Sequence, residues 1–431
     1  MFKKLLLATS YTILLQGTLM SATLNDLEYN DTQIPVVFEK NNALPIFNLQ
    51  LIFQNSGYIK DQNLSGLTNL TAKVLNEGTK KDGAISFARK LESKAISIDT
   101  SCGFETFVIE VSCLKEQYKN SLKYLKELLK DPNITNKTIS KLKNLQISKL
   151  QQKENDFDYI ASNKLKSIIF KDSVLSHPKS GEIEAINKIK KENIETRLDD
   201  ILNINNLIIA TGGDIKYKDI ANDIKDILEL LNKKPTTKIE KTKFNTSSKE
   251  IITKKDTKQS YIYFASPFYT DVNSKENYKT KVTSFILGGS GFGSRLMEEI
   301  RVKNGLAYSA YGNIHNNKSY SYFSGYLQTK IENTQKAKDM VSDIVNKFIK
   351  KGVTKKELDA AKKFLQGSEP LRTETFSQRL GRASNLYYKG LDFNYPQKEL
   401  DMIDSLTVEE LNKFIKSHLE LKELSFSIVT K

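Results

Sequence analysis

The chain of 431 residues has few of the side chains that bind metals through nitrogen or sulfur, and it has no tryptophan. Its three histidines, His177, His315 and His418, are far apart in the sequence. Their spacing matches neither one face of a helix nor a hairpin, as a shared metal site would require. We therefore expect each histidine to be a surface or packing residue and not a zinc ligand.

Cysteine is equally scarce, with two residues, Cys102 and Cys113. Both lie in an apolar, alternating stretch, Ala95 to Cys113, which predicts a β-hairpin that turns near Gly103. In such a hairpin one cysteine lies beside the turn and the other at the far end, too distant for a disulfide. No Cys-x-x-Cys or Cys/His pattern indicates a metal or nucleophilic site, so we expect two buried free thiols.

Long apolar runs are rare, and the clearest one has the pattern of an export signal. Lys3 and Lys4 precede a largely apolar stretch from Leu5 to Leu19. This pattern predicts a signal peptide over residues 1–22 and a bacterial periplasmic protein. Met20 stands where cleavage favours a small residue, so an uncleaved membrane anchor remains an alternative. No later segment is apolar enough to span a bilayer.

Negative charge is in deficit, since 66 lysines and arginines face 51 acidic residues and give a net charge of +15. Such an excess is typical of proteins that bind nucleic acids or membrane surfaces. The lysines, however, occur as scattered doublets such as Lys80-Lys81 and Lys190-Lys191. No basic stripe alternates with stacking aromatic residues, so we do not expect nucleic acid as a partner.

Length and composition, with 39% hydrophobic and 27% charged residues, predict a globular chain of two or more domains. Residues 231–259 are rich in Lys, Thr and Ser and lack apolar periodicity, as expected of a linker. They would join an N-terminal domain, residues 23–230, to a C-terminal domain, residues 260–431. The same order of elements is expected on both sides of the linker, which suggests duplicated modules.

The predicted modules share a pair of long helices after a strand pair and a closing strand. The expected helices cover residues 120–129 and 136–152 in the first module and 334–350 and 355–365 in the second, and the closing strands cover 206–211 and 424–429.

The first informative motif is Gly66 to Thr79, which has the frame of a zinc-protease helix without its ligands. In the motif H-x-x-E-H, two histidines one helical turn apart bind zinc, and the glutamate activates the attacking water. Here Asn69 and Lys73 stand at the histidine positions and Ala72 at the base position. An ammonium group is not a zinc ligand at neutral pH.

A plainer interpretation of this stretch is a short amphipathic helix packed on a sheet. Ser65 is a suitable N-cap, and Leu67, Leu70 and Val74 recur at helical spacing. On that interpretation Lys73 is solvated. If Lys73 instead points into the former metal pocket, its charge could partly replace that of the missing cation.

The second motif runs from Leu287 to Tyr311. Its glycines permit a tight turn before a helix from about Ser294 to Lys303, and Gly305 is expected to end that helix in a left-handed conformation before a strand begins. No strand–GxGxxG–helix unit surrounds the glycines, which disfavours a dinucleotide site.

Arg301 and Tyr308 lie seven positions apart in this motif and could face one cavity. A guanidinium offers several donors to carbonyl or carboxylate groups, and a phenol can donate to an oxyanion. The pair would therefore suit peptide binding. The alternative is an arginine in a surface ion pair beside a core tyrosine.

The two motifs together resemble the insulinase-like (M16) zinc peptidases, which include mitochondrial processing peptidase. The family's zinc helix opens with Gly-Leu and closes on Gly-Thr, as Gly66-Leu67 and Gly78-Thr79 do here. Its second half carries Ser-Arg-Leu at a helix start and Gly-Leu-Ala-Tyr entering a strand, as residues 294–308 do. The resemblance covers about residues 31–431.

The resemblance implies an α+β fold (an α/β roll) of two homologous halves, each a mostly antiparallel sheet covered by helices. The chain would form half of a clamshell around a peptide chamber. The family's third zinc ligand is a glutamate that would fall near Ile147 to Lys149. No acidic residue lies between Asn133 and Lys153, so an own zinc site is not expected.

The resemblance also implies a function, because some members of the family are heterodimers. One chain then carries His-x-x-Glu-His with zinc, and the other carries the Arg/Tyr residues that hold substrate. We predict that this chain is the non-catalytic partner, which binds an unfolded peptide through Arg301 and Tyr308 and has no cofactor of its own. The alternatives are a peptide-binding scaffold of the same fold and a homodimeric protease with unrecognised metal ligands.

Overall fold

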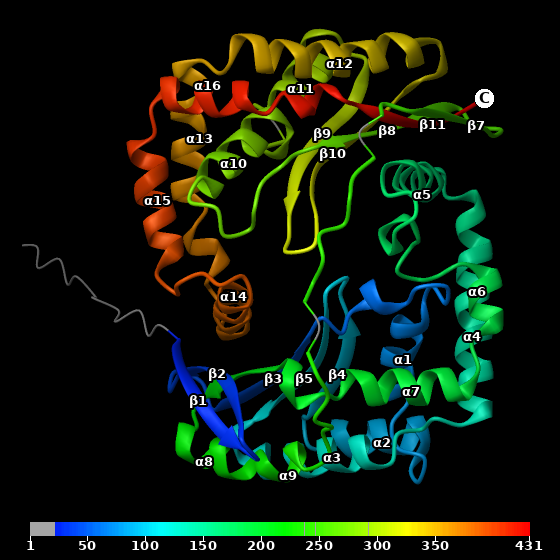
Figure 1. Ribbon diagram of the computed structural model, residues 1–431, viewed down its shortest axis with the longest axis vertical. Helices are drawn as coiled ribbons and strands as arrows, with labels where there is room; N and C mark the ends of the chain where they lie inside the picture. The colour runs from blue at the N-terminus through cyan, green and yellow to red at the C-terminus, as the bar shows by residue number, and fades with distance from the viewer. Residues whose placement is uncertain (1–21, 237, 246, 292) are drawn as a thin grey trace, which may run out of the picture.

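The computed structural model describes residues 22–431 except residues 237, 246 and 292. All but the last residue of the predicted signal peptide, 1–22, lies outside the described residues. The described chain forms two halves, each a β-sheet with helices, and Figure 1 shows the first half below the second. The predicted α+β class with two similar halves is therefore confirmed. Within the described residues, no helix combines the length and apolar character that a bilayer crossing requires.

The first half contains a six-stranded sheet in the order β1-β2-β6-β3-β5-β4. β2 and β6 are parallel, and the other neighbouring strands are antiparallel. Its strands are β1 (Thr23–Tyr29), β2 (Thr32–Lys40), β3 (Ile46–Gln54), β4 (Ser97–Cys102), β5 (Thr106–Leu114) and β6 (Leu207–Gly213).

Helices of the first half, with the exception of α5, pack mainly on one face of this sheet and form the largest core. They are α1 (Leu67–Leu75), α2 (Gly83–Glu92), α3 (Tyr118–Lys130), α4 (Asn136–Gln152), α5 (Phe157–Ile169), α6 (Ile183–Lys188), α7 (Lys191–Ile201), α8 (Tyr217–Asp223) and α9 (Lys225–Leu228).

The second half has a five-stranded sheet in the order β7-β11-β8-β10-β9. Its strands are β7 (Glu250–Lys254), β8 (Gln259–Pro267), β9 (Ala307–Asn316), β10 (Ser321–Lys330) and β11 (Ser425–Thr430). Its helices are α10 (Asn277–Ser284), α11 (Arg295–Met297), α12 (Thr334–Lys351), α13 (Lys355–Gly367), α14 (Phe376–Tyr388), α15 (Tyr395–Ser405) and α16 (Val408–Ser417), with π-helical turns at Phe285–Gly289 and Glu298–Lys303.

The two sheets have the same topology, apart from the additional edge strand β1. In each, one parallel pair (β2/β6 or β7/β11) is followed by a central strand and a hairpin. The closing strands β6 and β11 and the helix pairs α3/α4 and α12/α13 occupy matching positions in the chain. This correspondence agrees with the predicted duplication, and α4 begins and ends where the sequence predicted.

The predicted bounds of the linker, residues 231–259, are wrong at its C-terminal end. β7 lies inside this range and pairs with β11 in the second sheet. The strand escaped sequence analysis because it is an edge strand with little burial; Ile252 in its centre is 52% exposed. Edge strands are often short and carry charged side chains such as lysine, and β7 has both features.

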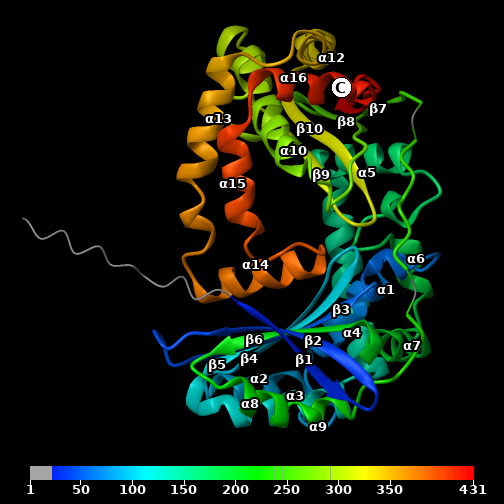
Figure 2. The same cartoon turned by 60° about the vertical axis from the view of Figure 1, so that its left-hand side comes forward.

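Each half contributes one helix to the other half's sheet, as both views show (Figures 1 and 2). α5 packs against β8 and β11 of the second sheet, and α14 packs against β2 and β6 of the first. Phe376 and Leu380 of α14 meet Val37 and Ile208 in a separate apolar cluster. The sheet faces that look toward the other half are thus covered reciprocally, and neither half is a free-standing unit.

Polar contacts reinforce this exchange. Arg379 of α14 lies 2.7 Å from the carboxylate of Glu39, which is 2% exposed. The hydroxyl of Tyr388 donates to Glu105 at 2.6 Å, and the backbone N–H of Ser319 donates to the same carboxylate at 2.7 Å. Because a buried carboxylate without partners is costly, these contacts tie the halves together.

The predicted hairpin of Ala95 to Cys113 is confirmed as β4 and β5, and both cysteines are buried and free. Burial raises the pKa of the Cys102 thiol to about 11, so it stays protonated and unreactive at neutral pH.

The three histidines lie in separate surroundings, as expected. His315 stacks on Tyr322, with ring centres 4.8 Å apart, and His418 stacks on Phe268 at 4.1 Å. His177 is on the surface beside Glu182, at 3.2 Å.

Candidate functional site

The degenerate motif forms α1, which is well packed on its inner face. Leu70, Val74 and Leu75 are each 1% exposed in the core of the first half. On the side of the sheet edge, Thr100 of β4 donates its hydroxyl hydrogen to the carbonyl of Ala72 at 2.6 Å. The helix frame is therefore intact and fixed against an edge strand.

The start of α1 differs from the expectation, because Ser65 is not its N-cap. Gly66 takes that position in a left-handed conformation (φ 91°), and Ser65 accepts a hydrogen bond from the backbone N–H of Glu182 instead. The buried carboxylate of Asp61 accepts from the backbone N–H groups of Gly66 and Thr68, both at 3.0 Å. A carboxylate from the preceding loop thus replaces the local hydroxyl as the cap of the first turn.

A second close approach brings the segment around residues 178–181 beside α1. A Cβ on Gly181 would lie 2.2 Å from the carbonyl oxygen of Ser65, and one on Gly66 would lie 2.9 Å from that of Ser180. Only glycine permits this packing. It forms one wall of a cavity of ≈ 590 Å³, which Asn69 and Lys73 line from α1.

Lys73 points into this cavity, as the replacement hypothesis required. Its ammonium donates a hydrogen bond to Oε1 of Gln146 on α4. Gln146 in turn donates from Nε2 to the carbonyl of Ser180 at 3.0 Å, which fixes the orientation of its amide. Gln146 lies one residue before the window, Ile147 to Lys149, in which the family's third zinc ligand was expected.

The groups present at the former zinc site do not fit zinc. Asn69 and Gln146 line the cavity with amides and Lys73 with an ammonium, while Ala72, at the base position, is buried in the core. Burial lowers the pKa of Lys73, and the neighbouring Lys149 lowers it further. Across the described part of the chain, no three His, Cys, Asp or Glu side chains cluster as metal ligands would.

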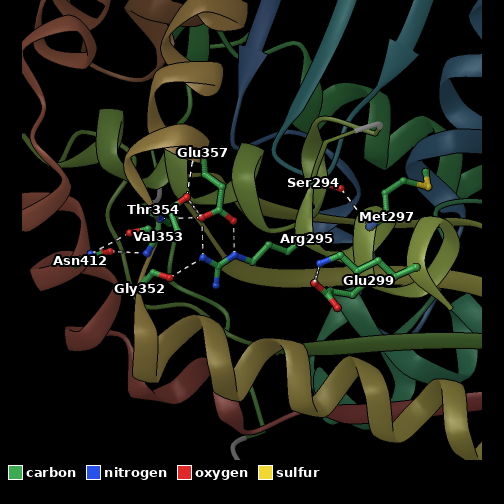
Figure 3. Close-up of polar contacts among 10 residues, drawn as sticks. Ser294, Arg295, Met297, Glu299, Gly352, Val353, Thr354, Glu357 and Asn412 are labelled. Atoms are coloured by element: carbon green, nitrogen blue, oxygen red, sulfur yellow. Dashed lines mark hydrogen bonds and ion pairs between the residues drawn. The ribbon is translucent and has the colours of Figure 1, made fainter.

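The second motif is built around Arg295, at the start of α11. Its guanidinium binds both carboxylate oxygens of Glu357, at 2.6 and 2.8 Å, and donates to the carbonyl of Gly352 at 2.6 Å (Figure 3). Glu357 also accepts from the backbone N–H of Thr354 at 2.8 Å, as part of the N-terminal cap of α13. Arg295 thus fixes the motif helix to α13 and positions Arg301 one and a half turns later.

Gly288 and Gly312 allow a further close approach in this motif. A Cβ on Gly288 would lie 2.6 Å from the backbone nitrogen of Gly312 in β9. The predicted helix of Ser294 to Lys303 is confirmed, as α11 followed by a π-helical turn, with Ser294 as its N-cap. Gly305 is left-handed (φ 59°) as expected.

Arg301 and Tyr308 meet, with the guanidinium carbon 4.6 Å from the centre of the tyrosine ring. Two residues of β9, Tyr308 and Ser309, lie between the paired residues Ala307 and Ala310, whereas the facing strand β10 has one residue there. This β-bulge turns Tyr308 outward. Bulges often redirect side chains beside functional sites.

The expectation of a shared cavity for this pair is not met, and neither is the alternative of a core tyrosine. Tyr308 is 82% exposed, so the pair lies on an open surface. The tyrosine is exposed because the bulge displaces it from the alternating pattern that buries Ala307 and Ala310.

Sequence analysis missed Gln146 and the lysines that surround the cavity. The absence of acids between Asn133 and Lys153 was noted as the loss of a ligand, but the same gap contains Lys149. Lys166 and Lys179 come from other elements and carried no signal of proximity. Arg295 could have been identified, since it stands in the Ser-Arg-Leu segment.

Comparison with known proteins agrees with the two motifs. Residues 36–181 match the family model Insulinase (Peptidase family M16), and residues 188–365 match the model Peptidase M16 inactive domain. The chain is 42% identical over 415 residues to the Helicobacter pylori protein called Non-peptidase homolog YmxG, covering 96% of this chain and 95% of that one.

Solved structures show the same fold. A peptidase M16 inactive domain from Pseudomonas fluorescens has a TM-score of 0.86 at 23% identity, covering 94% of this chain and 97% of that one. The periplasmic protease PqqL from Escherichia coli has a TM-score of 0.75 at 14% identity, covering 95% of this chain but 47% of its own. The chain therefore belongs to the insulinase-like M16 peptidase family, as a non-peptidase homologue whose residues do not form the family's zinc site.

Proposed function

We propose that this chain is the substrate-binding partner subunit of a zinc-bearing M16 peptidase. The observation that carries the proposal is the contrast between its two motifs. The zinc helix is folded but lacks ligands and base, while Arg301 and Tyr308 are in contact on an exposed bulge. A chain with this combination can hold a peptide but needs a second chain to supply the metal.

The exposure of Tyr308 supports a site that a second molecule completes. A phenol that is 82% exposed can donate to an oxyanion only if a partner or substrate excludes water from it. PqqL supports the pairing geometrically, since this chain matches 47% of it and that protein has room for a second unit of equal size. We propose that the second unit is a separate chain carrying His-x-x-Glu-His.

An extended, unfolded peptide suits the sheet edges of this chain. β4 and β9 are edge strands, and β4 lies beside α1. An edge strand can pair with a peptide backbone while side-chain sites beside it give specificity. The proposal places the pair in the periplasm, following the predicted signal peptide over residues 1–22 and the location stated for PqqL.

The test is peptide cleavage by the reconstituted pair of chains. Arg301→Ala and Tyr308→Phe should each lower turnover by about ten-fold to a hundred-fold, because each removes a donor to the substrate or transition state. Lys303→Ala, on the same π-helical turn and of the same charge, is the matched control and should leave turnover unchanged. Size-exclusion chromatography should show intact assembly in all three variants.

Unchanged cleavage by both Arg301→Ala and Tyr308→Phe pairs would overturn the assigned role and favour a scaffold. Stoichiometric zinc in the pure chain, together with cleavage by this chain alone, would favour the independent protease instead.

A further inference from the structure

The cavity at the former zinc site has a basic lining. It lies between α1, α4, α5 and the segment around residue 179, and its volume is ≈ 590 Å³. Five lysines line it from these elements: Lys73, Lys149, Lys153, Lys166 and Lys179. The acidic residues in the same wall are Asp156 and Asp158.

None of the five lysines forms an ion pair with a carboxylate among the residues that the structure describes. Lys73 donates to the neutral amide of Gln146, and Lys153 lies over the ring of Tyr159 at 4.2 Å. A lysine ammonium has three donors, so the hydrogen-bonding capacity of the group is far from used.

The carboxylates of the two aspartates accept hydrogen bonds from uncharged donors and not from the lysines. Asp156 accepts from the backbone N–H of Tyr159 at 3.0 Å and caps α5. Asp158 accepts from the hydroxyl of Tyr263 at 3.0 Å and from the amide of Gln328 at 2.9 Å. The cavity therefore keeps a positive excess, and a concave wall of one sign concentrates ions of the other sign.

Lys166 is the most constrained of the five lysines. It extends from the buried side of α5, between this cavity and a smaller one of ≈ 230 Å³ that it shares with Tyr263 and Ser162. Burial lowers the pKa of Lys166, as expected of an ammonium without a counterion. An anion beside it would offset that cost of burial.

The rest of the lining favours an organic anion over a bare inorganic one. Tyr58, Leu150 and Pro178 give apolar surface, and Asn69 and Asn163 give amides that can pair with peptide groups. The smaller cavity continues along β9 and β10 past tyrosines. A chain with a carboxylate on a short stem fits these walls.

We propose that this cavity binds carboxylate groups of an acidic peptide segment, with Lys73 and Lys166 as their principal partners. The ligand is taken to be a peptide because of the proposed function, on which this inference rests. The carboxylates come either from Asp and Glu side chains or from a free carboxyl terminus. In either case positive side chains occupy the place where active relatives hold a metal ion, and they retain its attraction for negative oxygen.

The first experiment measures binding of fluorescent decapeptides to the full chain by anisotropy. One peptide carries four glutamates, a second carries glutamine in their place, and each is made with a free or an amidated carboxyl terminus. The glutamate peptide should bind about ten-fold more tightly than its glutamine counterpart if side chains are the source. If the carboxyl terminus supplies the carboxylate, both peptides should bind more tightly with a free terminus than with an amidated one.

The variants identify the cavity as the site. Lys73→Gln and Lys166→Gln should each weaken binding of the preferred peptide about ten-fold, since each removes a charged hydrogen bond. Lys164→Gln is the matched control, because Lys164 is an exposed lysine on the same helix as Lys166 and the charge change is equal. It should change binding less than two-fold.

A second pair of variants tests charge without removing a lysine. Gln146→Glu places a carboxylate against Lys73 and should lower affinity for the acidic peptide by about ten-fold. Gln151→Glu, exposed on the same helix, should leave it unchanged. Circular dichroism of each variant checks that the fold is kept.

The inference is overturned if the glutamate and glutamine peptides bind equally in both terminal forms, or if Lys164→Gln weakens binding as much as Lys166→Gln. Tighter binding of an oligonucleotide of equal charge would also overturn it. These outcomes are separate from the test of the proposed function, because cleavage of a neutral peptide by the Arg301→Ala pair does not depend on this cavity.

Discussion

The two motif regions of this chain are built in the same way but differ in their chemistry. In the first half, close glycine packing at Gly66 and a buried cap from Asp61 fix α1 beside an edge strand. In the second half, close packing at Gly288 and the Arg295–Glu357 pair fix α11 beside another edge strand. The first region presents an ammonium and amides, whereas the second presents Arg301 and Tyr308.

The packing that holds the motif helix in place is therefore independent of the side chains that would carry its chemistry. α1 is held by contacts of its buried face and its first turn, and none of them involves Asn69 or Lys73. The ligand positions face the cavity, where substitution does not disturb the core. A fold can therefore lose its metal while its architecture stays in place.

The largest expected effect comes from returning the missing donors to α1. The combined variant Asn69→His, Ala72→Glu, Lys73→His and Gln146→Glu should bind about one zinc per chain, because positions 69 and 73 are one turn apart and position 146 faces position 73. Metal analysis after dialysis measures it. The same variant without Gln146→Glu is the control and should bind zinc more weakly. If the combined variant bound no zinc, the backbone of α1 and α4 would not have the geometry of a zinc site.

A smaller but substantial effect is expected from the cap of α1. Asp61→Ala leaves the N–H groups of Gly66 and Thr68 and the hydroxyl of Thr68 without their acceptor, and should lower the free energy of unfolding by about 3 kcal/mol. Urea denaturation measures the loss. Asp99→Ala, on the exposed face of β4, should cost less than about 0.5 kcal/mol. If both variants lost the same free energy of unfolding, Asp61 would not be the residue that stabilises the start of α1.

The equivalent anchor in the second half should give a comparable but smaller loss. Arg295→Met removes a two-point pair with Glu357 that is partly exposed, and should lower the free energy of unfolding by about 2 kcal/mol. Lys303→Met removes a single exposed pair with Glu299 and should cost about 0.3 to 0.5 kcal/mol. Similar values for both would mean that Arg295 does not position the motif.

How far the sequence predicted these regions depends on the range of the interactions involved. Local periodicity located α4 to the residue, and local glycines located the turn and cap of the second motif. Contacts between residues far apart in the sequence could not be predicted. Asp61, and not Ser65, caps α1, and β7 forms inside the predicted linker and pairs with β11. α5 and α14 each pack on the sheet of the other half.

The site was predicted in the same uneven way. Asn69, Ala72 and Lys73 could be assigned because one helical turn contains all of them. Arg301 and Tyr308 are in contact, but the exposure of Tyr308 follows from a bulge that appears only when β9 is aligned with β10. The basic cavity draws its lysines from separate elements, so no sequence window contains it.

The smallest effect concerns pH and His315, whose ring lies between the second sheet and α5. Burial lowers the pKa of His315, and the nearby Lys166 lowers it further. The unfolded chain then binds a proton near pH 6.5 that the folded chain does not, so stability is full above that pH and falls as pH drops below it. The loss is at most about 1.4 kcal/mol per pH unit.

His315→Gln should flatten this part of the stability profile between pH 7.5 and 5.5, measured by urea denaturation at each pH. His177→Gln, at the surface, should leave the slope unchanged. If the stability of His315→Gln still fell over this pH range, other titrating groups would be the cause.

We propose that the zinc used for cleavage belongs to another chain. The most direct test of this proposal is to count zinc in the purified chain, in the purified His-x-x-Glu-His chain and in their complex, with cleavage of an unfolded peptide measured on the same samples. We expect no zinc in this chain, one zinc per complex, and cleavage that requires both chains. One tightly bound zinc in this chain, with cleavage by it alone, would show instead that the chain is a peptidase by itself.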